Sequence, residues 1–153
     1  MELIMFFGQI GAALAMGLAA FGSSIGIGKA GVSAAGAWAK EGKSGKTLNF
    51  TYIILLGMPI SQTLYAMIVM GQMQKALSNQ ELALANAGLL LGIGLATGLG
   101  EMLSAWMQGL IGAASIRSIN EGEKGLVFML IAMGIVETVG IFVMVFMLGL
   151  IPK

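Results

Sequence analysis

The stretch from Gly125 to Ile151 constrains the fold more than any other part of the chain. It is apolar throughout, except for one ionisable side chain, Glu137, close to its midpoint. About 27 helical residues rise roughly 40 Å, which is enough to cross a hydrocarbon core about 30 Å thick. A charge at that depth costs several kcal/mol, so a spanning helix retains a carboxylate only with a partner or a function. The sequence therefore predicts a transmembrane helix with a mid-membrane site.

The composition is that of a membrane protein. Hydrophobic residues make up 58% of the chain and charged residues 10%, and the net charge is +1. So small a charge gives no basic surface for nucleic acid. Because the chain has no Cys and no His, thiolate or imidazole metal sites and Ser-His or Cys-His catalysis are excluded.

Three further apolar segments precede the last one, so the sequence predicts an all-α protein with four transmembrane helices. These segments run from about Leu3 to Lys40, from Leu48 to Met73 and from Leu82 to Ile116. Short polar connections join them at 41–47, 75–81 and 118–124. Connections of this length make neighbouring helices antiparallel, and both termini then lie on one side.

Lysine and arginine are unevenly divided between the two sides. Lys40, Lys43 and Lys46 lie at or in the first connection, and Arg117 and Lys124 lie at the third. The other side has only Lys75 and Lys153. The positive-inside rule therefore places loops 41–47 and 118–124 in the cytoplasm and both termini outside.

The two halves of the chain resemble each other, which indicates a duplicated helical hairpin. Residues 1–153 form one membrane domain, divided into a first hairpin at 1–77 and a second at 78–153. The segment Ser61-Gln-Thr63 corresponds to Val136-Glu-Thr138. Gln62 thus stands where the second half has Glu137, so one half has the acid and the other a neutral amide.

Small residues are frequent in the first and third predicted helices, and bulky residues in the second and fourth. Small residues let helices approach closely in lipid, so this pattern predicts tight packing within a bundle. In a second interpretation, the helices rich in small residues also crowd side by side around a common axis and form an inner layer. Bulky side chains such as Tyr52, Leu55 and Phe142 would then face lipid.

Oxygen-bearing groups occur in three of the predicted helices. Pro59 disturbs the turn before it and frees backbone carbonyls there. Gathered together, the candidate ligands are the Met58 carbonyl and the side chains of Ser61, Gln62, Gln108 and Glu137. Such an all-oxygen set with one negative charge suits a hard monovalent cation. The alternative is an interhelical hydrogen-bond network with Glu137 protonated.

A family resemblance adds to this interpretation. The motif MPISQTLY at 58–65, Gln108 and IVET with Glu137 resemble the proteolipid (K or c) subunit of V-type ATPases, above all the bacterial sodium-translocating kind. The resemblance covers the whole chain and implies a homo-oligomeric rotor ring. It implies that Glu137 is the essential carboxylate and that the other candidate ligands help it to bind Na⁺. It further implies that Tyr65 hydrogen-bonds Glu137 and locks the site.

The resemblance also implies partners and a location. Identical subunits would form the ring, a stator membrane subunit would supply a basic residue, and a central-stalk subunit would attach to the ring. The expected location is the plasma membrane, in contact with lipid, and ATP hydrolysis would occur on other subunits. Na⁺ is favoured over H⁺ because proton-carrying relatives generally lack the full set of polar ligands.

Several alternatives stay open. A small four-helix antiporter would use Glu137 as an exchange carboxylate, and a structural bundle would transport nothing. Glu101 is either a protonated acid hydrogen-bonded to a neighbouring helix or an accessory carboxylate, on the ion's route or in the inner wall of the ring. The glycine patterns at 26–31 and 45–47 lack the strand context or spacing of phosphate-binding loops, so we expect no nucleotide site.

Overall fold

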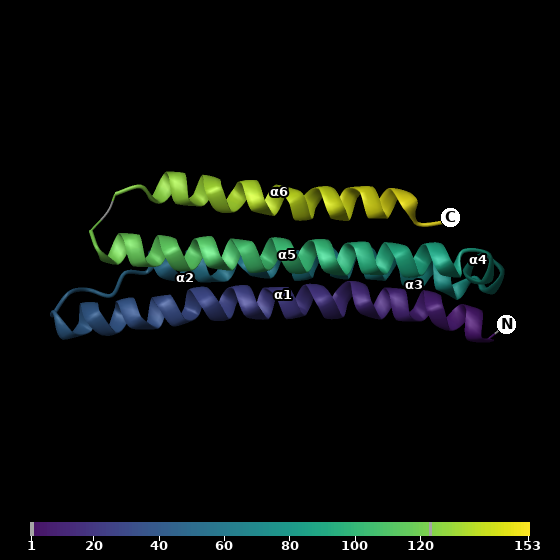
Figure 1. The fold of residues 1–153 in the computed structure, drawn as a ribbon, viewed down its shortest axis with the longest axis horizontal. Coiled ribbons are helices and arrows are strands. Elements are labelled where there is room, and N and C mark those ends of the chain that lie inside the picture. The colour runs from purple at the N-terminus through teal and green to yellow at the C-terminus, as the bar shows by residue number, and fades with distance from the viewer. Residues whose placement is uncertain (1, 123) are drawn as a thin grey trace.

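The computed structural model describes residues 2–122 and 124–153, which form helices joined by short turns (Figure 1). The elements are α1 (Glu2–Lys43), α2 (Thr51–Gly57), the 3₁₀ turn η1 (Met58–Ile60), α3 (Ser61–Ser78), α4 (Gln80–Ala85), α5 (Ala87–Asn120) and α6 (Leu126–Leu150). Met1, in the first predicted hairpin, and Glu123, in the predicted connection 118–124, lie outside the described residues.

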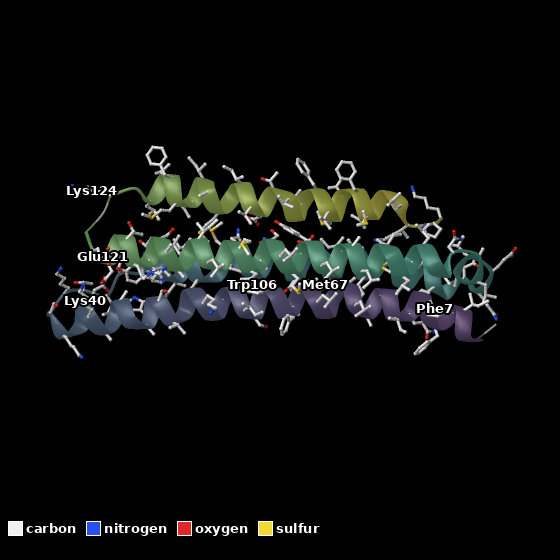
Figure 2. The ribbon with its side chains drawn as sticks, viewed as in Figure 1. Phe7, Lys40, Met67, Trp106, Glu121 and Lys124 are labelled. Atoms are coloured by element: carbon white, nitrogen blue, oxygen red, sulfur yellow. The ribbon has the colours of Figure 1, made fainter. Side chains whose placement is uncertain are left out.

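Four helical stretches of the described chain are long and apolar enough to cross a membrane. They are Ile4–Lys43, Thr51–Ser78, Ala87–Asn120 and Leu126–Leu150. Figure 1 shows α1, α5 and α6 running alongside one another, with both termini at one end and the turns after α1 and α5 at the other. Lys40, Glu121 and Lys124 all lie at this turn end (Figure 2). The predicted all-α fold with four membrane helices is confirmed.

Some predicted helix boundaries were wrong. Helix α1 continues to Lys43, because the chain folds back onto its last turn. The Glu41 carboxylate accepts hydrogen bonds from the Asn49 N–H at 2.9 Å and from the Tyr52 hydroxyl at 2.8 Å. The predicted third helix begins instead as the separate helix α4, whose first turn is capped by the Asn79 side chain (3.2 Å to the Leu82 N–H).

The turn at Pro59 behaves as predicted from the sequence. Proline lacks an N–H and cannot continue the regular α-helical pattern. The second membrane stretch is accordingly interrupted by η1, which separates α2 from α3. The interruption lies next to Ser61 and Gln62, so it exposes irregular backbone beside polar side chains.

Helices α1 and α5 pack backbone against backbone at glycines. A Cβ placed on Gly94 would collide with the backbone of Gly11, and one placed on Gly109 would collide with Gly26. Such close approach in lipid maximises van der Waals contact between helices. The glycines at this contact therefore serve the tight packing of helices inside the subunit that the sequence predicted.

Bulky side chains do not all lie on the outside. Phe128, Phe142 and Phe146 on α6 are exposed, as expected for residues that face lipid. Tyr52 and Leu55 are fully buried, so their prediction as lipid-facing residues was wrong. Tyr52 is drawn inward because its hydroxyl bonds Glu41 and its ring packs 6.0 Å from that of Trp38.

Candidate ion-binding site

Glu137 lies in the middle of α6 and faces α3 and α5. Its Oε1 accepts a hydrogen bond from the Tyr65 hydroxyl at 2.9 Å, and its Oε2 accepts one from Gln108 Nε2 at 3.4 Å. The side chain is half-buried, so it is reachable from the outer surface of the subunit. The carboxylate is therefore fixed by two neighbouring helices while one side stays accessible.

Two fully buried amides connect α3 to α5 behind this carboxylate. Gln62 Nε2 donates to Gln108 Oε1 at 3.2 Å. Gln108 Nε2 also donates to the Met133 carbonyl of α6 at 3.3 Å. These bonds fix the orientation of both amides, so their oxygens keep defined positions between the helices.

The helix break at Pro59 places a hydroxyl, that of Ser61, and a backbone carbonyl, that of Met58, at the candidate site. Ser61 Oγ lies 3.0 Å from the Met58 carbonyl oxygen and 3.2 Å from Gln62 Oε1. A hydroxyl has one proton to donate, so these two acceptors share it. A continuous network therefore runs from Met58 through Ser61, Gln62 and Gln108 to Glu137. All five candidate ligands and Tyr65 belong to this network.

Ser104 is part of this network and was missed by the sequence reasoning. Its Oγ accepts a hydrogen bond from Gln62 Nε2 at 3.1 Å and donates one to the Val136 carbonyl at 2.9 Å. It therefore bridges α3 and α6 from a position on α5. The available signal was its spacing, four residues before Gln108 on the same helical face.

Glu101 lies outside the hydrogen-bonded network. It is fully buried on α5, and neither carboxyl oxygen has a hydrogen-bond partner among the described residues. Its Oε2 lies beside Gly140 of α6, close enough that a Cβ on Gly140 would approach it to 2.6 Å. Glu101 thus packs against α6 one helical turn along from Glu137.

The duplicated positions Gln62 and Glu137 have different surroundings. Gln62 is fully buried between α3 and α5, whereas Glu137 is half-exposed on α6. The neighbour of Gln62, Thr63, donates to Ser23 Oγ of α1 at 2.7 Å. The polar residues Gln62 and Thr63 of the first half thus bond other helices inside the subunit, whereas Glu137 of the second half is directed toward the surface.

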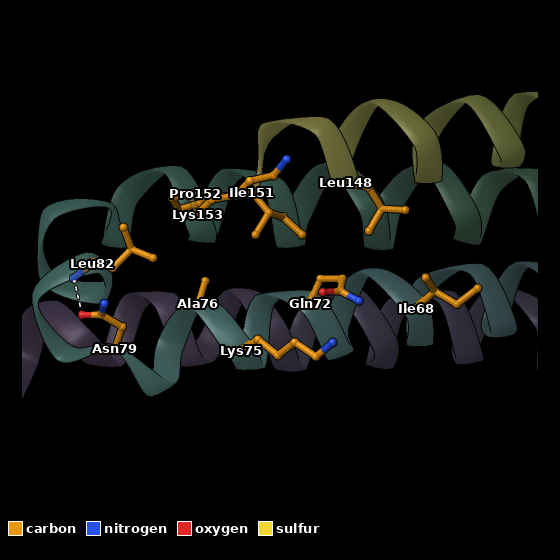
Figure 3. Close-up of a pocket in the computed structure, with 10 residues that line it drawn as sticks. All are labelled: Ile68, Gln72, Lys75, Ala76, Asn79, Leu82, Leu148, Ile151, Pro152 and Lys153. Carbon is orange, nitrogen blue, oxygen red and sulfur yellow. Dashed lines mark hydrogen bonds between the residues drawn. The ribbon is translucent and has the colours of Figure 1, made fainter.

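A pocket of about 550 Å³ at the end near the termini is separate from this site (Figure 3). Its lining includes Lys75, Lys153 and Gln72, and the apolar side chains of Ile68 and Leu148. None of the predicted ligands lines it. This pocket is therefore not the site predicted from the sequence.

Replacing Tyr65 with phenylalanine removes one of the two bonds to Glu137 and should loosen the carboxylate. A hydrogen bond to a charged group contributes about 1.5–3 kcal/mol, so ion affinity should fall roughly tenfold or more. The ion concentration that half-protects Glu137 from carbodiimide labelling measures this change. The matched control is Tyr52→Phe, which loses a similar bond to Glu41 far from the site; equal effects in both variants would contradict the prediction.

Fold and site together define a class of protein: a protein of two helical hairpins, with four helices able to cross a membrane and a half-buried carboxylate, Glu137, in the middle of the last helix. A family model that describes the C subunit of ATP synthase matches residues 10–71 and, a second time, residues 91–150. The chain belongs to this family of ATP synthase C subunits. A comparison with curated proteins gave no match.

The two family matches correspond to the two hairpins. The first covers most of α1 together with α2 and much of α3, and the second covers most of α5 together with α6. The duplication predicted from the sequence is thereby confirmed. Membership makes the chain a non-catalytic rotor-ring subunit in the membrane sector of a rotary ATPase.

Proposed function

We propose that this chain is the proteolipid of a V-type ATPase and that each copy in the ring carries one Na⁺ on Glu137. The single observation that carries the proposal is the network that links four neutral oxygen-bearing groups, from η1, α3 and α5, to the Glu137 carboxylate of α6. One negative charge neutralises one monovalent cation, and the neutral oxygens replace the water that the ion gives up. Family membership favours this rotor over the antiporter and the structural bundle.

Sodium rather than a proton is favoured by the number of polar partners. A proton needs only the carboxylate, whereas Na⁺ needs several oxygens around it. Both oxygens of Glu137 act as acceptors, from Tyr65 and from Gln108, which suits an anion that faces a bound cation. Ser61, Gln62 and the Met58 carbonyl then complete the coordination, and Tyr65 holds the loaded carboxylate in place.

The half-exposed position of Glu137 suits a rotating ring. With Na⁺ bound, the site is neutral and passes through hydrocarbon at low free-energy cost. A basic residue of the stator membrane subunit would displace the ion, and a central-stalk subunit would turn the ring. Moving one charge through 100 mV takes about 2.3 kcal/mol, which ATP hydrolysis on other subunits would supply. In the plasma membrane, the turns after α1 and α5 would face the cytoplasm and both termini the outside.

Carbodiimide labelling of Glu137 in assembled membranes tests the choice of ion. We expect millimolar or lower Na⁺ to slow labelling at fixed pH, because the bound ion occupies the carboxylate. The matched control replaces Na⁺ with equal concentrations of a bulky organic cation, which keeps ionic strength constant. Protection by raised pH alone, with no effect of Na⁺, would instead identify a proton-carrying rotor.

The same preparation tests the ring. A ring should migrate on a detergent gel far above the 15.8 kDa of one chain and collapse to the monomer after harsh extraction. A species no larger than a dimer, still able to exchange cations, would support the antiporter and contradict the proposal.

A further inference from the structure

One face of α5 carries four buried polar residues at helical spacing: Thr97, Glu101, Ser104 and Gln108. Their exposed fractions are 0%, 0%, 4% and 0%. Ser104 and Gln108 are hydrogen-bonded, but the Thr97 hydroxyl and both Glu101 oxygens have no partner among the described residues. An unpaired buried polar group costs about 1–3 kcal/mol, so two of them one turn apart require a physical explanation.

The carboxyl group of Glu101 and the hydroxyl of Ser104 border the same gap between α5 and α6. A Cβ placed on Gly140 would lie 2.6 Å from Glu101 Oε2, 3.3 Å from Ser104 Oγ and 3.4 Å from Gln62 Cγ. The missing side chain at Gly140 therefore makes room for the carboxyl group. That carboxyl group lies behind the ion site, next to the residue that holds the Gln62 amide.

The hydrogen-bonding capacity that remains here matches a protonated carboxyl group. Ser104 Oγ donates to Val136 and accepts from Gln62, which leaves one of its two acceptor positions open. Thr97 still has a hydroxyl proton to donate. An ionised Glu101 has only acceptors, so it cannot use the open position on Ser104. A neutral Glu101 carboxyl group has an acceptor oxygen, which the Thr97 hydroxyl lacks as a partner, and an O–H donor, which the open position on Ser104 lacks.

We propose that Glu101 holds a fixed proton and links Thr97 to Ser104, and that this row of groups orients the Gln62 amide in the ion site. Neither bond is formed in the structure. In the proposed arrangement the side chains turn toward each other, so that Thr97 donates to the carbonyl oxygen of the Glu101 carboxyl group and the Glu101 O–H donates to Ser104 Oγ. Ser104 keeps its bonds to Gln62 and Val136. Glu101 is thus a positioning residue that does not carry the transported ion. The role of Gln62 rests on the proposed function, whereas the proton on Glu101 does not.

Infrared difference spectroscopy of the assembled complex tests the fixed proton directly. In Na⁺-saturated membranes, the wild type should show the carbonyl-stretch band of a protonated carboxyl group, and Glu101→Gln should lack it. The matched control is Glu81→Gln, an exposed acid on α4, which should retain the band. Spectra of the wild type and Glu101→Gln that coincide in this region would overturn the proposal.

Sodium affinity tests the positioning role. Half-protection of Glu137 labelling should need roughly five- to tenfold more Na⁺ in Ser104→Ala, which loses the bond to Gln62, and in Glu101→Leu, which loses the proposed bond to Ser104. Glu101→Gln should stay within about twofold, because a neutral amide also accepts from Thr97 and donates to Ser104. Half-protection does not depend on how much ring assembles, so poor expression of a variant does not mask the result.

Two outcomes would overturn the positioning role. Equal weakening in Glu101→Gln and Glu101→Leu would show that Glu101 acts as a charge, and unchanged affinity in Ser104→Ala and Glu101→Leu would show that the row does not orient Gln62. Failure of the proposed function is a separate result. In that case, Na⁺ would not protect wild-type Glu137, while the infrared comparison would still decide the proton on Glu101.

Discussion

Replacing Glu137 with glutamine is expected to abolish ion transport while leaving the rotor ring assembled. Glutamine nearly preserves the shape of the side chain, and it keeps an oxygen that can accept from Tyr65. It removes the negative charge, however, so a bound cation would remain uncompensated in hydrocarbon. That cost is several kcal/mol, which lowers occupancy about a hundredfold or more.

Ion uptake driven by ATP in membrane vesicles measures this loss, and detergent gels report whether the ring forms. The matched control is Glu81→Gln, which removes an exposed acid on α4 and should leave uptake unchanged. Uptake by the Glu137 variant at more than a few per cent of the wild type would show that another group carries the ion.

Replacing Gly94 with alanine is expected to disrupt the subunit itself. The added methyl group would collide with the backbone of Gly11 on α1, and backbone atoms cannot rotate away as a side chain can. Overpacking of a close contact costs about 1–3 kcal/mol and often more where backbone must shift. We therefore expect a large drop in the amount of assembled ring and in the temperature at which it dissociates.

The control for this prediction lies two residues away. Gly92→Ala introduces the same methyl group on α5 where no described atom of a neighbouring helix lies within 4 Å of the new Cβ. Alanine also favours the helix over glycine by about 0.5–1 kcal/mol, so this variant should be as stable as the wild type or more so. Similar losses at both positions would show that the close contact between α1 and α5 is not responsible.

The membrane helices and the candidate ligands could both be predicted from the sequence, because both follow from the low polarity of the hydrocarbon core. Lipid cannot hydrogen-bond to protein, so apolar runs identify the spans, and the polar groups inside them are few and conspicuous. Glu137, Gln108 and Gln62 are conspicuous for this reason. The helix break at Pro59 can also be predicted from the sequence, because a proline lacks the N–H in any helix and therefore has the same local effect.

Other features depend on contacts that the sequence does not encode locally. A serine in a membrane helix can bond its own backbone, so residue type alone does not distinguish Ser104, which bridges two helices, from Ser115, which bonds Ile111 four residues earlier. The burial of Tyr52 follows from a bond to Glu41 across a turn. These outcomes are decided by tertiary packing.

The length of α1 has a mechanical consequence. Its 42 residues span roughly 63 Å, about twice the hydrocarbon thickness, whereas the 25 residues of α6 span roughly 38 Å. In Figure 1, α1 extends beyond both ends of α6. A partner that binds the ends of α1 would therefore hold a long helix at positions beyond the reach of α6, while the shorter helix that bears Glu137 lies recessed between those ends.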